Sequence, residues 1–209
     1  MLLHNRLTAT RKGRILGVAA ITVALALTVA GCSSTGSGSS GGGKKNLAIT
    51  FLPKSLGNAY FNTSDKAGEA AIKSFGGTYA EVAPAEGSAN AQVSFINTLT
   101  QQGVGAIVLS SDDPKANCTA ISKAQKAGIK VVTFDSDTAP GCRDIFVNQA
   151  TAQGIADAQV KILIDGIGTS GEIAFLSATP NDTNQNLWIK LMSATFNAKY
   201  PNIKIDGIA

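Results

Sequence analysis

The sequence predicts an α/β protein with a doubly wound parallel sheet, in which helices cover both faces. Two observations carry this prediction. From Asn46 onward, short apolar runs typical of buried strands alternate with amphipathic stretches of helical period. The length of 209 residues allows one large domain, or one and a half small ones.

Residues 46–149 are expected to form a complete N-terminal α/β lobe. Strands are predicted at 46–52, 78–83, 106–110 and 130–134. Helices are predicted at about 61–75, 89–102 and 114–127. In the first helix one face carries Ala67, Ala71, Ile72 and Phe75, which we expect to pack on the sheet.

The same alternation continues after residue 149 with fewer elements. Helices are predicted at about 150–164 and 184–200, and strands at 172–177 and 202–206. The sequence ends at Ala209, just after the last strand. We therefore expect residues 150–209 to form a partial second α/β lobe.

The N-terminus has the pattern of an export signal. Four basic residues lie within the first fourteen, and the uncharged stretch 15–30 is shorter than the roughly 20 apolar residues of a membrane span. Residues 1–31 are therefore expected to be a signal peptide. The stretch closes on LTVAGC, which resembles a bacterial lipobox and indicates lipidation of Cys32. An ordinary signal with an incidental cysteine is the alternative.

Residues 32–45 are rich in Ser and Gly and are expected to be a flexible tether after the lipidated cysteine. This arrangement favours an exported protein anchored to a membrane of the cell envelope, in the periplasm or on the outer face of the cytoplasmic membrane. A lipoprotein would carry more than one acyl chain, because a single chain anchors only marginally.

The charge distribution argues against a nucleic-acid partner. Of the 18 Lys and Arg residues, four lie in the signal segment, so the remaining fourteen equal the 14 Asp and Glu residues. The single histidine, His4, also lies in that segment. Catalysis by a Ser–His–Asp or Cys–His pair and His-ligated zinc are therefore excluded for the mature part. We expect no cofactor and no metal.

Two cysteines remain in the predicted mature part, Cys118 and Cys142. The export signal places them in an oxidising compartment, where a disulfide is the favoured interpretation. A redox pair is disfavoured because the two residues lack CxxC spacing.

Candidate ligand-binding residues follow the predicted strands. Asp135 and Asp137 come directly after the strand at 130–134, at the carboxyl edge where open α/β sheets bind ligands. A carboxylate there can accept hydrogen bonds from two adjacent sugar hydroxyls. Loop solvation or capping is the alternative role for both.

The loop after the first strand supplies further candidates at the same edge, namely Lys54, Asn58, Tyr60 and Phe61. An aromatic ring can stack on the apolar face of a sugar, while Lys and Asn meet its hydroxyls. The aromatic residues could instead belong to the core.

In the second predicted lobe, the segment TPNDTNQNLW provides the amides of Asn184 and Gln185. Helix capping is the expected role of Asn181, Asp182 or Thr183. Trp188 is expected to pack within its helix.

Two other patterns have structural interpretations. Asp112 and Asp113 precede Pro114 and are expected to cap a helix with proline at its first position. The stretch GIGTSG (166–171) follows a helix and precedes a strand, which is the reverse of the dinucleotide-binding arrangement. We therefore expect a turn that ends the helix.

These stretches together resemble the type I periplasmic sugar-binding proteins of ABC transporters, most closely the rhamnose-binding and quorum-signal-binding members. The resemblance spans about residues 50–200 and rests on FLPKSLGNAYF, INTLTQQGVGAIVLSSDDP, GIKVVTFDSD, CRDIFVNQA and LSATPNDTNQNLW. It implies two α/β lobes that clamp a monosaccharide, and a membrane permease as partner. Members of this family are longer, so the resemblance also implies C-terminal truncation.

The resemblance assigns roles to individual residues. Lys54 matches a ligand-contacting lysine of the quorum-signal binders, and Asp135 matches the hydroxyl-binding aspartate of the family. Asn58, Tyr60 and Phe61 match an asparagine and the stacking aromatics of ribose binders, and Gln185 matches a second-lobe amide. Asn184 stands where the quorum-signal binders carry aspartate, which favours rhamnose or a similar deoxyhexose.

The expected function is thus sugar capture by a substrate-binding lipoprotein, without catalysis. Binding of a quorum-signal furanose is one alternative, and a secreted glycosidase that uses two carboxylates is an alternative of a different class. Residues 135 and 137 share one loop and are poorly placed to flank a glycosidic bond, which disfavours the enzyme.

Overall fold

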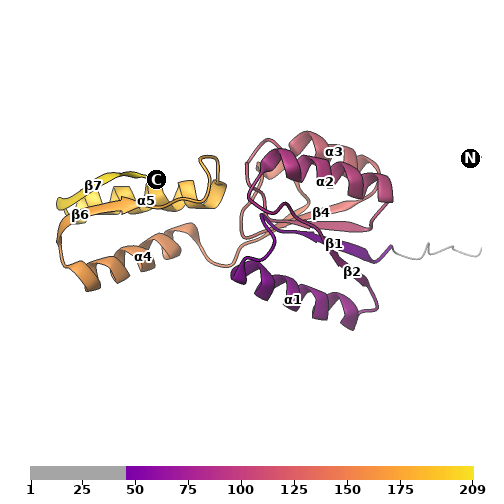
Figure 1. Ribbon diagram of the computed structural model, residues 1–209, viewed down its shortest axis with the longest axis horizontal. Coiled ribbons are helices and arrows are strands. Elements are labelled where there is room, and N and C mark those ends of the chain that lie inside the picture. The colour runs from indigo at the N-terminus through magenta and orange to yellow at the C-terminus, as the bar shows by residue number, and fades with distance from the viewer. Residues whose placement is uncertain (1–45) are drawn as a thin grey trace, which may run out of the picture. The chain divides into compact units, whose positions relative to one another are not determined.

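The computed structural model describes residues 46–209 (Figure 1). The predicted signal peptide (1–31), the lipidation site Cys32 and the tether (32–45) lie outside the described residues. Within residues 46–209, no helix combines the length and the apolar character that crossing a membrane requires.

The first sheet has five strands, all parallel, in the order β2-β1-β3-β4-β5. Its strands are β1 (Ala48–Leu52), β2 (Thr78–Glu81), β3 (Ala106–Leu109), β4 (Lys130–Phe134) and β5 (Ile145–Val147). This is the doubly wound α/β class that the sequence predicts.

Three helices and one short 3-10 helix accompany this sheet: α1 (Ala59–Ser74), α2 (Ala89–Gln102), α3 (Cys118–Lys126) and η1 (Pro140–Cys142). Figure 1 shows α2 and α3 on one face of the sheet and α1 on the opposite face. The core between sheet and helices includes Leu52, Ile96, Ile107, Ile121 and Val131, all without solvent exposure. We call residues 46–149 the five-stranded region.

The buried face of α1 differs from the predicted one. The helix buries Phe61, Asp65 and Ile72, whereas Phe75 is exposed. The reason is the contact at Gly68, where an added Cβ would come within 2.3 Å of Cζ of Phe51. The helix therefore meets the sheet through its glycine, and the positions in line with Gly68 are the buried ones.

The start of α3 also corrects the sequence-based expectation. Residues 114–117 form a turn, because Asp113 Oδ1 accepts hydrogen bonds from the backbone N–H groups of Lys115 and Ala116. This local bonding pattern stabilises a turn in place of the first helical residues. A disulfide joins Cys118, the first residue of α3, to Cys142 in η1.

The second sheet has two parallel strands, β6 (Ser170–Phe175) and β7 (Asn202–Ile208). Helices α4 (Ala152–Ile167) and α5 (Thr183–Lys199) complete what we call the two-stranded region, residues 150–209. Its core includes Ala156, Val160, Phe175, Met192 and Phe196.

The turn predicted from GIGTSG is confirmed. Helix α4 ends at Ile167, and Gly168 follows with φ of 81°, a left-handed value that glycine adopts without strain.

Candidate binding cleft

A polar hollow of about 330 Å³ lies where the loops after β1, β3 and β4 meet the segment that leads into α5. Such a position, at the carboxyl ends of parallel strands, is where open α/β sheets bind ligands. Seven of the eight predicted ligand-binding residues line this hollow: Lys54, Asn58, Tyr60, Phe61, Asp135, Asn184 and Gln185.

Lys54 is the centre of the polar contacts in the hollow. It follows β1 and is buried, and its ammonium donates to Asp182 Oδ1 at 2.6 Å and to Asn184 Oδ1 at 3.1 Å. Asp135 Oδ2 lies 3.8 Å from the same Nζ atom. Lys54 therefore links the five-stranded region to residues that precede and begin α5.

Asp135 occupies a special backbone conformation directly after β4. Its φ of 59° is the single positive value of a non-glycine residue in the range 46–209. Its Oδ2 accepts from Ser110 Oγ at 2.7 Å, and its Oδ1 accepts from Asn184 Nδ2 at 3.1 Å. Burial raises the pKa of this carboxyl group, while the Ser110 hydrogen bond and the Lys54 charge oppose the rise.

Two adjacent aromatic residues line the hollow with different exposure. Phe61 is 6% exposed and meets Phe134 edge-on, with ring centroids 6.1 Å apart. Tyr60 is 47% exposed, and burial of its hydroxyl together with the charge of Asp135 raises its pKa. Tyr60 is thus the ring with a face accessible to a ligand, and Phe61 supports it with centroids 5.3 Å apart.

The side chains of Asn58 and Gln185 line the hollow and also fix the local backbone. Asn58 Oδ1 accepts from the backbone N–H of Tyr60 at 2.9 Å, which caps α1. Gln185 Oε1 accepts from the backbone N–H of Ala178 at 2.9 Å, which ties the loop after β6 to α5. These contacts hold both side chains in place at the rim.

Asp137 lies beside the 330 Å³ hollow and is not among its lining residues. Its Oδ2 forms an ion pair with Arg143 Nη2 at 2.8 Å, and its Oδ1 accepts from Thr133 Oγ1 at 2.5 Å. It lines an adjoining small cavity of about 90 Å³, whose lining also includes Asp135 and Asn184. The side chain therefore stabilises the loop between β4 and η1, and the 330 Å³ hollow lacks it.

Two further acidic residues line the hollow, Asp112 and Asp182, for which the sequence predicts helix capping and not ligand binding. The position of Asp182 just before α5 predicts a helix-capping role. However, its side chain makes no cap hydrogen bond to α5 and contacts Lys54 instead. Asp112 could have been found, because it follows β3 at the same sheet edge as Asp135. Asp182 carries no such signal, since its partner lies 128 residues away in the sequence.

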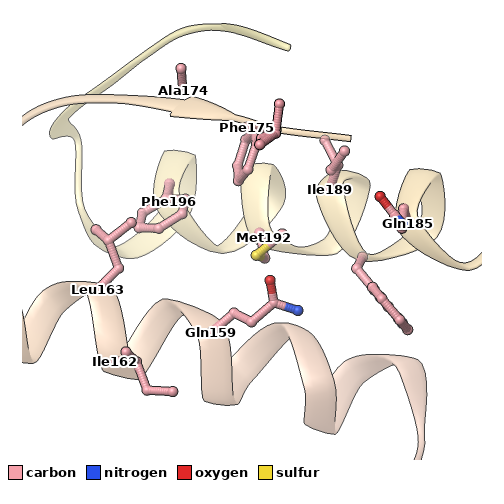
Figure 2. Close-up of a pocket in the computed structure, with 11 residues that line it drawn as sticks. Gln159, Ile162, Leu163, Ala174, Phe175, Gln185, Ile189, Met192 and Phe196 are labelled. Atoms are coloured by element: carbon pink, nitrogen blue, oxygen red, sulfur yellow. The ribbon is translucent and has the colours of Figure 1, made fainter. Parts of the chain in front are cut away.

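A second and larger hollow of about 530 Å³ lies between α4, β6 and α5 (Figure 2). Its lining is mostly apolar, and Figure 2 shows Gln159 of α4 directed toward Met192 of α5. Among the described residues that line it, the polar side-chain groups belong to two glutamines and to Trp188, and none is charged. We place the candidate site in the 330 Å³ hollow, because recognition of a polar ligand needs several convergent hydrogen-bonding groups.

The structure thus has an α/β fold with a hollow lined by convergent polar groups at the carboxyl edge of a parallel sheet. Residues 49–208 match the periplasmic binding protein domain family, and the chain belongs to that family, with the type I fold.

Three relatives illustrate the similarity. Ribose import binding protein RbsB of Bacillus subtilis (strain 168) is 28% identical over 142 residues, which cover 68% of this chain and 46% of the relative. An ABC transporter solute binding protein from Clostridium phytofermentas, solved with bound L-rhamnose, has 33% identity and a TM-score of 0.75, covering 78% of this chain and 51% of its own. LsrB from Clostridium saccharobutylicum, in complex with AI-2, has 32% identity and a TM-score of 0.71, covering 75% and 51%. The chain thus spans about half the length of these relatives.

Proposed function

We propose that this chain is the solute-binding component of an ABC sugar importer, and that it captures a monosaccharide without transforming it. The observation that carries the proposal is the hollow itself, where Lys54, Asp135 and Asn184 surround a space beside the exposed ring of Tyr60. Carboxylate, amide and ammonium groups together can satisfy a ring of hydroxyls, each of which both donates and accepts.

The proposed ligand is rhamnose or a similar deoxyhexose. Relatives that carry ribose, L-rhamnose and AI-2 in their names or titles support a small polyhydroxylated ligand. A quorum-signal furanose such as AI-2 is the second candidate, because Lys54 lies in the hollow beside Asn184. The carboxyl group of aspartate at position 184 would favour that candidate more strongly than the amide does.

The proposed mechanism is capture between two lobes, residues 46–149 and 150–209. Lys54, Tyr60 and Asp135 belong to the first, and Asn184 and Gln185 to the second. A ligand that contacts both favours the closed arrangement, so binding shifts a population toward it. No step requires a covalent bond or a proton transfer.

The proposed setting is the cell envelope. Signal peptide 1–31, lipidation at Cys32 and the tether 32–45 would hold the binding part next to a membrane, where an ABC permease would receive the sugar. Membership of the periplasmic binding protein family supports a location outside the cytoplasm.

The test is isothermal titration of the full chain, purified in detergent, with L-rhamnose, D-ribose and AI-2. We expect saturable heat with L-rhamnose and weaker heat with the other two. Quenching of Trp188, the single tryptophan and a lining residue, provides a second readout. A glycosidase would instead release p-nitrophenol from p-nitrophenyl α-L-rhamnoside.

Asp135→Asn is the informative variant, with Asp157→Asn in α4 as its matched control. Asn keeps the size of the side chain and removes the charge that strengthens hydrogen bonds to hydroxyls. We expect affinity to fall at least about tenfold for Asp135→Asn. Asp157 is exposed, accepts a hydrogen bond from Gln153 in its own helix and does not line the 330 Å³ hollow, so its variant should bind as the wild type does. Absence of heat with all three ligands would refute the proposed function.

A further inference from the structure

Two aspartates in the hollow each keep one carboxylate oxygen without a hydrogen-bond partner. Asp112 is 3% exposed; its Oδ2 accepts from the backbone N–H of Ser88 at 2.8 Å, and its Oδ1 has no partner within residues 46–209. Asp182 is 0% exposed; its Oδ1 accepts from Lys54, and its Oδ2 is likewise unmatched in that range. Buried carboxylate oxygens without donors are costly, so a functional explanation is needed.

The two aspartates belong to one wall of the hollow. Gly87 lies at this wall, and a Cβ atom added to it would come within 3.1 Å of Asp112 Oδ1 and 3.4 Å of Thr179 Cγ2. Thr179 Oγ1 is also buried and has no partner among the described atoms. We call Gly87, Asp112, Thr179 and Asp182 the Gly87 notch. Gly87 adds no side chain to the groups that cover Asp112 Oδ1, and this oxygen, like Asp182 Oδ2, is buried in the structure.

The charges around the hollow give the notch its chemical preference. Among the described lining residues, three are acidic (Asp112, Asp135 and Asp182) and one, Lys54, is basic. Burial raises the pKa of Asp112 to about 6, with an opposing effect of the Ser88 N–H and of Lys54 and a further rise from Asp182. A ligand group that donates a hydrogen bond would satisfy the open oxygens, whereas an anionic group would add like charge to a buried site.

We propose that the Gly87 notch is a second ligand-binding subsite, which accepts hydrogen bonds from ligand hydroxyls and excludes anionic sugars. The inference rests on the proposed function and narrows its substrate class to uncharged polyhydroxylated rings. Uronates and sugar phosphates are excluded by the excess of carboxylates. Asp135 recognises one part of the ring, and Asp112 and Asp182 recognise another.

The experiment uses the full chain and two matched ligand pairs in isothermal titration. L-rhamnose is compared with L-mannuronate, in which a carboxylate replaces the methyl group, and D-ribose with D-ribose 5-phosphate. In whichever pair the wild type binds the neutral sugar, we expect its affinity for that sugar to be at least about a hundredfold higher than its affinity for the anionic sugar of the same pair.

Asp112→Asn and Asp182→Asn test the subsite directly. Each retains an oxygen for its existing contact and replaces the open acceptor by an amide donor. We expect each variant to bind the neutral sugar at least about tenfold more weakly than the wild type does. The ratio of the affinities for the neutral and the anionic sugar should also be smaller than in the wild type. Asp113→Asn is the matched control, because Asp113 lies one residue away, does not line the hollow, and as Asn keeps the Oδ1 acceptor of its turn. It should bind as the wild type does.

Gly87→Ala provides a test that changes no charge and remains informative if an aspartate variant does not fold. The methyl group would lie 3.1 Å from Asp112 Oδ1 and displace this oxygen slightly, so we expect weaker binding together with a small fall in the melting temperature. Wild-type affinity in Asp112→Asn and Gly87→Ala, or equal affinity of the wild type for the neutral and anionic members, would overturn the inference. A wild type that binds no neutral sugar would instead remove the proposed function, and the inference with it.

Discussion

The five-stranded and two-stranded regions use the same alternation of strand and helix and reach different degrees of burial. In the first, core side chains such as Ile107 and Val131 have no solvent exposure. In the second, core residues such as Ile173 and Ile189 each remain 8% exposed, and Leu176 and Ile162 are largely exposed. Five strands with helices on both faces enclose a core, whereas two strands with two helices enclose it only in part.

The residues of the candidate site are also held in place differently in the two regions. Lys54 and Asp135 follow strands that are fixed in the enclosed core of the five-stranded region. Asp182 and Asn184 are joined to them by polar contacts at 2.6 to 3.1 Å. The site therefore has a rigid side and a side whose position depends on hydrogen bonds and one ion pair.

Core truncation should give the largest effect and the clearest contrast. Ile107→Ala removes a fully buried side chain, and we expect the free energy of unfolding to fall by about 4 kcal/mol. Ile189→Ala, in the less enclosed core, should cost about 2 kcal/mol because its surroundings can relax. Urea titration followed by circular dichroism measures both. Equal losses would contradict the contrast, and the exposed Ile162→Ala serves as the control.

Removal of the disulfide should act on the five-stranded region. The Cys118→Ser/Cys142→Ser variant releases a cross-link between residues 24 apart, and we expect a loss of about 3 kcal/mol. Trp188 lies in α5 and reports on the two-stranded region. We expect the urea midpoint from circular dichroism to move more than the midpoint from Trp188 fluorescence. Identical shifts would mean that the two regions unfold as one unit.

Asp65 should make the stability of the five-stranded region depend on pH. Burial, with a contribution from Glu81, raises its pKa in the folded state from 3.8 to about 6. Between these values the folded state binds more protons than the unfolded state, so stability is lost as the pH rises through about 6. Asp65→Asn should therefore be more stable than the wild type at pH 7.5, by about 2 kcal/mol, and equal to it near pH 3. Chemical unfolding of both proteins at pH 3 and pH 7.5 measures this difference in stability. The same difference at both pH values would contradict a raised pKa of Asp65.

The smallest effect is expected at the ion pair across β6 and β7. Lys204 Nζ lies 3.1 Å from Glu172 Oε1, and both side chains are exposed, so solvent screens the pair. Lys204→Gln should change the free energy of unfolding by less than about 0.5 kcal/mol. A larger loss in a thermal melt would show that charge, and not apolar packing, holds the two strands together.

Much of the fold follows from local sequence signals. The bounds of α2 agree with the prediction of 89–102 because Ser88 caps its start and Gly103, with φ of 66°, ends it. The buried face of α1 could not be predicted from periodicity, because it depends on a ring of β1 that contacts Gly68. The start of α3 follows from the turn that Asp113 stabilises, because the sequence pattern alone does not show whether Asp113 caps a helix or a turn.

Some residues of the candidate site can likewise be predicted from local sequence signals, and others cannot. Lys54, Tyr60 and Asp135 can be selected from sequence because each follows a predicted strand at one edge of a parallel sheet. Asp137, two residues beyond Asp135, has the same local signal, yet Arg143 binds its carboxylate outside the hollow. The role of Asp182 depends on a partner distant in sequence, and only folding brings the two residues together.

The left-handed backbone at Asp135 limits how such a cleft can change over evolution. Glycine, asparagine and aspartate adopt this conformation at low cost, whereas larger or β-branched residues do so with strain. Few substitutions at this position would preserve the turn and still offer a carboxylate. New ligand preferences would therefore arise around Asp135, at neighbours such as Ser110 and Asn184, while the aspartate itself stays constant.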